Sequence, residues 1–273
     1  MMRITTLTTL TKWTAILAMT ACTAAADDGP ATSGPLYPNS IVSNSLSFLE
    51  LSDPSVSYCI GFTGRDTKEM PGSPHWDLIA QDVYVFAAHY ADGTTVQIWA
   101  SPRFASTQAA QTEADEIAKR LALLPSFMRE TLSHVVLHTG DGGAFAEHLG
   151  HFFMVYADNM ATRRSQNDME ETLFHESVHA TMDARFRDGD PDWASVQAQD
   201  PGFVTNYARD RISEDLAESA IFAYADKYHP GRLPDAVTAR VYEVMPARME
   251  YLQNILPAAD EFTVQMRAAK DCG

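Results

Sequence analysis

The chain has 273 residues, of which 45% are hydrophobic, and a formal net charge of −16. This length and apolar content suffice for one full hydrophobic core and exclude an intrinsically disordered chain. The acidic balance lacks the basic footprint of a nucleic-acid-binding protein, so we expect no nucleic acid among its partners.

Residues 1–26 are predicted to be an export signal. Basic residues precede an apolar run at 13–21 that is too short to cross a bilayer as a helix. Residues 19–22 fit a bacterial lipobox, in which Cys22 is lipidated, whereas residues 24–26 offer an ordinary A-x-A cleavage site. We therefore expect an exported protein of the bacterial cell envelope, either lipid-anchored or periplasmic or secreted. Its membrane contact is limited to the N-terminal lipid.

The remainder is predicted to be a tether followed by a single domain. Residues 27–45 are rich in Ala, Asp, Gly, Pro and Ser, which is typical of a flexible linker, and residues 46–273 form the domain. The mature chain keeps Cys59 and Cys272, and an even pair in an oxidising compartment predicts a disulfide. The alternative is two unrelated thiols.

The pattern along the domain places strands before helices. The alternation of apolar residues and a tight Asp-Gly turn predict strands at 41–62, 83–90, 95–100, 132–138 and 151–156. Apolar spacing of helical period predicts helices at 107–124, 168–186, 210–228 and 234–256, the last kinked at Pro246. Residues 63–76 are expected to be a loop, and Asp168 with Glu171 fits a capping box. This order predicts an α+β fold.

The central motif is His175-Glu176-Ser177-Val178-His179. On a helix, His175 and His179 lie one turn apart on one face and can bind one metal ion, with Glu176 beside it. This is the H-E-x-x-H pattern of zinc hydrolases, so Zn²⁺ is the expected cofactor. A catalytic zinc site needs a third protein ligand and one position for water.

Several residues were candidates for the third ligand. Asp183 continues the face of the histidines but lies about 12 Å along the helix from His175, too far to reach one ion. The metzincin extension is excluded because Met182 and Arg185 occupy its Gly and His/Asp positions. Asp200, in an irregular segment, stays open on spacing alone.

A better candidate lies on the next helix, where Glu214 and Glu218 are one turn apart beside apolar residues. We expect Glu214 to bind the metal and Glu218 to accept the remaining ring N–H of a ligand histidine, which fixes the tautomer. Two acidic residues one turn apart on a helix more often form a solvent-exposed face than part of a metal site. Because this pair follows the H-E-x-x-H helix, we favour the metal site here.

These motifs resemble the gluzincin peptidases, and more closely the catalytic domain of anthrax lethal factor and its relatives. In those relatives a tyrosine lies seven residues before the glutamate ligand of a Glu-x-x-x-Glu helix, as Tyr207 does here before Glu214. The chain is also similar to bacterial envelope proteins with an H-E-x-x-H-A-x-x-D core. The resemblance covers residues 168–220. It implies a zincin-like fold, with a small, mostly antiparallel sheet on the motif helix and a helical C-terminal part.

The predicted function is zinc-dependent hydrolysis of a peptide or protein substrate. Glu176 is the general base for the attacking water, and Tyr207 stabilises the oxyanion. Residues 151–156 are either the edge strand that binds the peptide or a core strand. Two rivals remain: an exported zinc-binding interaction module without turnover, and a lipoprotein with a chance motif. The retained Glu176 argues against the first, and the downstream acids argue against the second.

Overall fold

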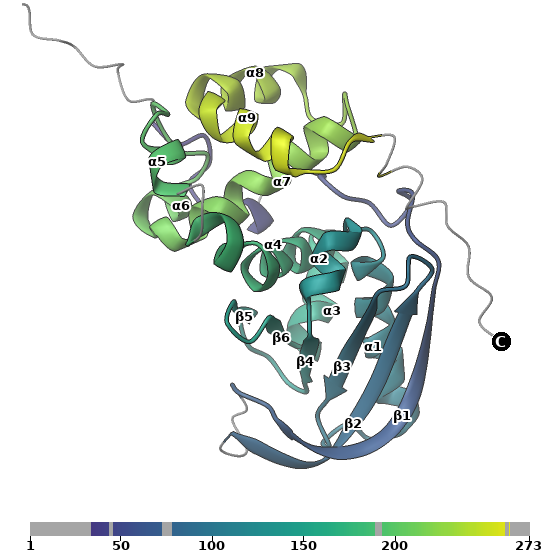
Figure 1. Cartoon of the computed structure of the whole chain (residues 1–273). Coiled ribbons are helices and arrows are strands. Elements are labelled where there is room, and N and C mark those ends of the chain that lie inside the picture. Colours follow the sequence, from purple (N-terminus) through teal and green to yellow (C-terminus); the bar gives the residue numbers. More distant parts are fainter. Residues whose placement is uncertain (1–33, 44–45, 73–77, 189–192, 260–261, 263–273) are drawn as a thin grey trace, which may run out of the picture. The chain divides into compact units, whose positions relative to one another are not determined.

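Six strands form one mixed sheet in the computed structural model, which describes residues 34–43, 46–72, 78–188, 193–259 and 262 (Figure 1). The strands are β1 (Tyr58–Glu69), β2 (Ile79–Tyr90), β3 (Thr95–Ala100), β4 (His134–His138), β5 (Phe145–Glu147) and β6 (Phe152–Tyr156). Their order across the sheet is β1-β2-β3-β4-β6-β5.

Both parallel and antiparallel pairs occur in this sheet. The pairs β1–β2, β2–β3 and β5–β6 are antiparallel, whereas β3–β4 and β4–β6 are parallel. The expected α+β class is confirmed, but the mostly antiparallel sheet is corrected to a mixed one. The reason is the crossover after β3, since α1 and α2 carry the chain back so that β4 runs parallel to β3.

Two of the described helices lie between β3 and β4 in the chain, and the rest follow β6 and include the one around which several others pack. The helices are α1 (Thr107–Leu121), α2 (Ser126–Thr131), α3 (Ala157–Gln166), α4 (Met169–Thr181), α5 (Trp193–Gln197), α6 (Asn206–Asp210), α7 (Asp215–Tyr228), α8 (Asp235–Val244) and α9 (Pro246–Ile255). Three short turns complete the set: η1 (Ile41–Ser43), η2 (Asp183–Arg187, a π-helical turn) and η3 (Ile212–Glu214).

Helix α4, which carries the H-E-x-x-H motif, lies at the centre of these contacts. It touches β5 and β6 on one side, α1, α2 and α3 along its length, and α7 beyond (Figure 1). Every residue of α4 except His179 is buried. A helix that is covered all round is held by packing on every face, which fixes its rotation and so the direction of its histidines.

The two faces of the sheet have different cores, as the period of two along a strand requires. Val135 and Leu137 of β4 join the large core beneath the helices. Val136, between them, points to the other face and joins a small cluster with Met154 and Tyr156 of β6.

The capping box expected at the start of α4 is absent. Asp168 is the N-cap residue, but its side chain makes no capping hydrogen bond and instead accepts one from Arg163 at 2.9 Å. Glu171 turns away to accept the backbone N–H groups of Phe48 and Leu49 at 3.0 and 3.4 Å. The carboxylates are used for tertiary contacts that the local pattern does not reveal.

Residues 34–43, expected to belong to a flexible tether, pack against the domain. Tyr37 forms a bridge with Thr205, and its backbone bonds to Val204 and Asn206 at 3.0 Å each. Ile41 is 1% exposed. The tether prediction is therefore wrong for this stretch, because its apolar residues find buried positions near α7.

The structure leaves several N- and C-terminal predictions untouched. The signal segment with Cys22 and the C-terminal Cys272 lie outside the described residues, so lipidation and the Cys59–Cys272 disulfide stay predictions. Across the described ranges, each helix falls short of the length and apolarity that a bilayer span requires.

Candidate metal centre

Two imidazoles converge on the C-terminal half of α4. His175 and His179 are one helical turn apart, and their Nε2 atoms lie 3.1 Å from each other. The rings meet edge to face, with centroids 4.8 Å apart. Both can therefore direct a lone pair toward one point, as the spacing in the sequence predicts.

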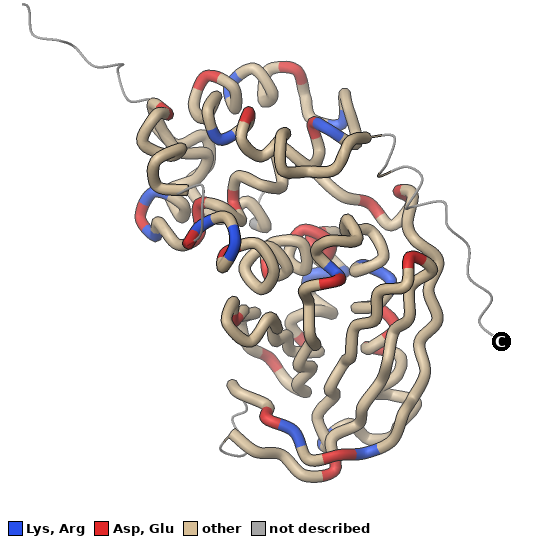
Figure 2. The backbone as a smooth tube through the Cα atoms, in the orientation of Figure 1, with Lys and Arg blue, Asp and Glu red and all other residues tan. Residues whose placement is uncertain are grey.

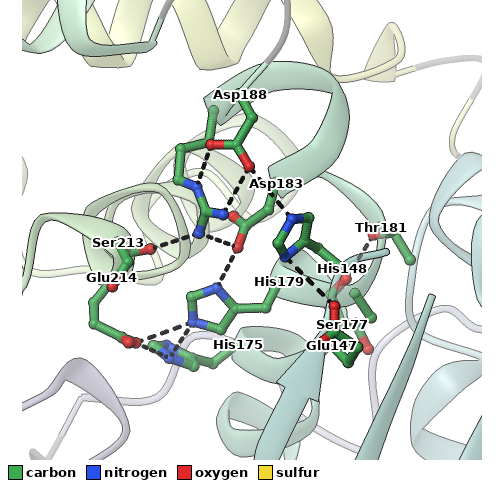
Figure 3. Close-up of polar contacts among 12 residues, drawn as sticks. Glu147, His148, His175, Ser177, His179, Thr181, Asp183, Asp188, Ser213 and Glu214 are labelled. Atoms are coloured by element: carbon green, nitrogen blue, oxygen red, sulfur yellow. Dashed lines mark hydrogen bonds and ion pairs between the residues drawn. The ribbon is translucent and has the colours of Figure 1, made fainter. Parts of the chain in front are cut away.

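Glu214 completes a group of three. It sits at the end of η3, directly before α7, and its Oε2 lies 3.3 Å from His175 Nε2 and 3.0 Å from His179 Nε2 (Figure 3). In the described part of the chain these three residues form a group that could hold a metal ion.

The separations suit a tetrahedral ion. Zinc bound at about 2.0–2.1 Å by each ligand places neighbouring ligand atoms about 3.3 Å apart. The three observed separations are 3.0, 3.1 and 3.3 Å, so the side chains need to move by only a few tenths of an ångström. Two imidazoles and one carboxylate are also a donor set that zinc accepts, with one position left for water.

Hydrogen bonds in this group shift two pKa values in opposite directions. Burial lowers the pKa of His179, but hydrogen bonds to Asp183 and Glu214 outweigh burial and raise it to about 10. Burial raises the pKa of Glu214, but hydrogen bonds from the two histidines hold that pKa well below its usual value. The carboxylates of Asp183 and Glu214 thus stabilise a proton on the His179 ring, and a metal ion bound by this ring would take the place of that proton.

Asp183 orients one of the candidate ligand histidines. Its Oδ2 lies 2.8 Å from His179 Nδ1, and the same oxygen accepts from Arg187 at 2.5 Å. Arg187 in turn reaches the Ser213 carbonyl at 3.4 Å, next to Glu214. Asp183 is absent from the ligand group, as expected, but its role behind His179 was missed. The available signal was its position four residues after His179, one helical turn further on.

Glu218 lies behind the other histidine. Its Oε1 is 3.4 Å from His175 Nδ1, a close charge contact without hydrogen-bond alignment. The carboxylate is fully buried and accepts from Ser40 at 2.5 Å, from the Ile41 backbone N–H at 2.8 Å and from Thr205 at 2.8 Å. The structure thus places Glu218 beside His175 but without the predicted hydrogen bond to the ring, and it adds a second set of partners.

Glu176 and Tyr207 line the same cleft as the three candidate ligands. Burial raises the pKa of Glu176, and the neighbouring histidines act against that shift. Burial also raises the pKa of Tyr207, with a further contribution from the charge of Glu214. A carboxylate whose pKa is raised is a stronger proton acceptor than an ordinary carboxylate, and a protonated phenol can donate a hydrogen bond.

The cleft has a volume of about 450 Å³ and three walls. The first wall is the β5 region, the second is α4 with η2, and the third is α6 with η3. Its lining residues are Ala144, Phe145, Ala146, His148, His175, Glu176, His179, Asp183, Arg187, Tyr207, Arg211, Ser213 and Glu214.

The strand at the rim is β5 and not the segment 151–156. Strand β6 lies between β4 and β5 and is therefore internal, which corrects the edge-strand alternative in favour of the core-strand one. Strand β5 pairs only with β6 among the described strands, and Phe145 on it is 51% exposed. With three residues, β5 is too short to show the alternation that identifies strands.

Asp200, which spacing alone left open as a ligand, lies elsewhere. Its carboxylate accepts from the Ala247 backbone N–H at 2.6 Å and from Arg248 Nε at 2.8 Å. It therefore belongs to a buried ion-pair cluster at α9.

Comparisons of the chain with protein-family models, curated proteins and solved structures found no match.

Proposed function

We propose that this protein is a zinc-dependent peptidase with a zincin-like arrangement. The observation that carries the proposal is the convergence of His175, His179 and Glu214 at tetrahedral spacing. Glu176 lines the same cleft, and an edge strand forms one wall of it. A metal-binding triad, a carboxyl group and an exposed strand edge are what hydrolysis of an extended peptide needs.

The metal ion and the protein side chains have separate roles in the proposed reaction. A zinc ion held by His175, His179 and Glu214 would supply Lewis acidity, which would lower the pKa of a water molecule and polarise the scissile carbonyl. Glu176 takes a proton from the attacking water as the new C–O bond forms. It then delivers that proton to the amine as the C–N bond breaks. The Tyr207 phenol donates a hydrogen bond to the carbonyl oxygen as that oxygen gains negative charge.

Substrate binding uses the backbone of β5. Its outer edge offers N–H and C=O groups to a peptide that adds as a further strand, and the adjacent cleft takes the side chains. The N-terminal segment points to an exported enzyme of the bacterial envelope, with Cys22 as the lipid-bearing residue if the lipobox is used.

Three measurements on the purified protein test the proposal. After chelator treatment and reloading, mass spectrometry of the metal content should give about one zinc per chain. Glu176→Gln should keep this zinc and lose roughly 10²- to 10⁴-fold in hydrolysis of a peptide library. Glu214→Ala should lose zinc and hydrolysis together.

The outcomes separate the alternatives. A wild-type protein that binds no zinc contradicts the proposal at its base. Zinc binding with no hydrolysis of any library peptide favours the interaction module without turnover. Hydrolysis that persists at full rate in Glu176→Gln, purified in parallel, identifies a contaminating peptidase.

A further inference from the structure

We propose that Arg211 binds a carboxylate of the substrate, so that the enzyme prefers acidic peptides. This inference rests on the proposed function and adds the substrate class. Arg211 lies on the wall of the cleft formed by α6 and η3, together with Tyr207 and Glu214. It directly follows α6 and is exposed.

The guanidinium of Arg211 has no carboxylate partner among the described residues. Its side-chain contacts are with Tyr207: Nη1 lies 3.5 Å from the phenol oxygen, and the guanidinium carbon lies 5.1 Å from the ring centroid. The ring packs against part of the cation, and Arg211 as a whole lines the cleft. Arginine presents those donors in a planar fork that matches a carboxylate.

The other arginine in the cleft is already neutralised. Arg187 donates to Asp183 at 2.5 Å, and both its Nε and its Nη2 donate to Asp188 at 2.9 Å. It therefore has little capacity left for a substrate. Figure 2 shows positive and negative positions following one another closely along the α6 region, and there Arg209 is paired with Asp210 at 2.8 Å.

The charge balance of the cleft leaves Arg211 as the fixed cation available for a substrate. Asp183 and Arg187 offset each other, and a zinc ion would offset Glu176 and Glu214. Since the chain as a whole carries −16, an acidic substrate is attracted at this cleft and disfavoured over most other surfaces.

The position of Arg211 also limits which substrate residue it can reach. Its Nη1 lies 3.5 Å from the phenol that we assign to the scissile carbonyl oxygen. An extended peptide advances about 3.3 Å per residue. The bound carboxylate therefore belongs to an Asp or Glu within about two residues of the scissile bond, or to the C-terminus of a short substrate.

The experiment uses the zinc-loaded protein and a library of peptides with free and amidated C-termini, with cleavage sites read by mass spectrometry. The wild type should show Asp and Glu enriched near the cut bond in amidated peptides. Dependence on a free C-terminus instead assigns the carboxylate to the chain end. Arg211→Gln should lower kcat/KM roughly three- to tenfold more for the preferred acidic peptides than for matched neutral peptides, mainly through KM.

Two further variants make the result specific. Arg211→Glu should shift the preference to Lys and Arg. Arg209→Gln, which removes a neighbouring cation that is paired and outside the cleft, should leave the preference unchanged. Acid enrichment that persists in Arg211→Gln overturns the inference. So does an equal loss of kcat on all peptides, because that result would place Arg211 in transition-state stabilisation.

A binding measurement keeps the inference testable without turnover. Zinc-loaded Glu176→Gln is titrated calorimetrically with two peptide hydroxamates that differ only in a Glu or a Gln side chain. The Glu form should bind roughly three- to tenfold tighter, and Arg211→Gln should abolish the difference. Equal binding overturns the role of Arg211 even if peptidase activity is established. Absence of Glu176-dependent cleavage overturns the proposed function instead.

Discussion

A relay of three side chains sets the direction of His179. Arg187 donates to Asp183, and Asp183 accepts from His179 Nδ1, which leaves Nε2 as the nitrogen that faces Glu214. A carboxylate behind a ligand histidine fixes its tautomer and makes the ring a stronger metal ligand. His175 has only the misaligned 3.4 Å contact with Glu218 behind it, so the two histidines are supported unequally.

Asp183→Asn is therefore expected to weaken zinc binding by roughly 10- to 100-fold. The amide keeps the shape of the side chain but loses the charge that stabilises the N–H of His179. Competition with a calibrated chelator measures the affinity. Asp188→Asn is the matched control, because Asp188 also pairs with Arg187 but contacts neither candidate histidine ligand. Equal losses in both variants would assign the effect to Arg187 rather than to His179.

The raised pKa of His179 makes zinc binding and stability depend on pH in opposite ways. Zinc needs the neutral imidazole, so binding displaces a proton, and the affinity should rise by up to about tenfold per pH unit from pH 6 to 8.5. Without metal, the folded pKa of about 10 exceeds the ordinary 6.5. The stabilisation is complete below pH 6.5 and is lost as pH rises through about 10.

Thermal unfolding with and without zinc checks both pH dependences, that of zinc binding and that of the stability of the metal-free protein. The metal-free protein should be more stable at pH 6.5 than at pH 9.5, and the gain from added zinc should be larger at pH 9.5. Asp183→Asn should reduce the pH dependence of the metal-free form. An affinity that stays constant from pH 6 to 8.5 would contradict the displacement of a proton.

Spacing in the sequence was sufficient to predict which residues meet at this centre. The interval of four between His175 and His179 places both on one helical face whatever surrounds them. Glu214 was predicted from the pair that it forms with Glu218 after the motif helix, although it lies at the end of η3, directly before α7, and not on the helix itself. The same spacing offered a signal for Asp183, which lies four residues after His179, but α4 ends before Asp183 and the π-helical turn η2 begins there.

A buried arginine on α9 secures the start of α7, the helix that directly follows Glu214. Arg248 is fully buried and bonds to Asp215, to Asp200 and to the Gly202 carbonyl. Asp215 also accepts from Trp193 at 3.0 Å and from Gln197 at 2.7 Å. The residue after Glu214 is thereby tied to α5 and α9, which restricts the position of the Glu214 backbone.

Arg248→Leu should destabilise the protein strongly. The substitution leaves two buried carboxylates without their cation, which costs about 3–5 kcal/mol, or roughly 10 °C in Tm for a chain of this size. Arg240→Leu is the control, because the Arg240–Glu243 pair is exposed and should contribute less than about 1 kcal/mol. Thermal unfolding of the metal-free proteins checks the difference, and similar Tm values would show that the cluster contributes little.

Elements with strong local signals were predicted well, and those fixed by distant partners were not. The hairpin of β2 and β3 follows from its Asp-Gly turn, and the break between α8 and α9 falls at Pro246 as expected. Residues 63–69 were expected to be loop but belong to β1, because pairing with β2 holds a polar stretch extended. The helix expected at 210–228 is interrupted at Arg211, where φ is −136° and ψ is 89°.

At the scale of the whole molecule, three distant parts of the chain meet at Glu218. The N-terminal segment reaches it through Ser40 and Ile41, the loop before α6 reaches it through Thr205, and α4 reaches it through His175. A single buried carboxylate thus links the N-terminal segment at Ser40 and Ile41 to the candidate metal centre. Such a network is stabilising only when each donor is present.

Removal of the N-terminal segment should consequently affect both stability and metal binding. A chain that begins at residue 46 leaves Glu218 with Thr205 and His175 as its partners, and the loss of two hydrogen bonds to a buried carboxylate costs about 3–6 kcal/mol. The unpaired charge then draws the His175 ring away from the metal position, so zinc affinity should fall as Tm falls.

A chain that begins at residue 34 keeps Ser40 and Ile41 and is the control. Glu218→Gln in that longer chain separates the two effects, because its amide oxygen can accept from Ile41 and Thr205, which share Oε2, while the uncharged NH2 group replaces Oε1 toward Ser40 and His175. If the chain from residue 46 matches the chain from residue 34 in both Tm and zinc affinity, the segment is a tether after all, and the coupling through Glu218 is absent.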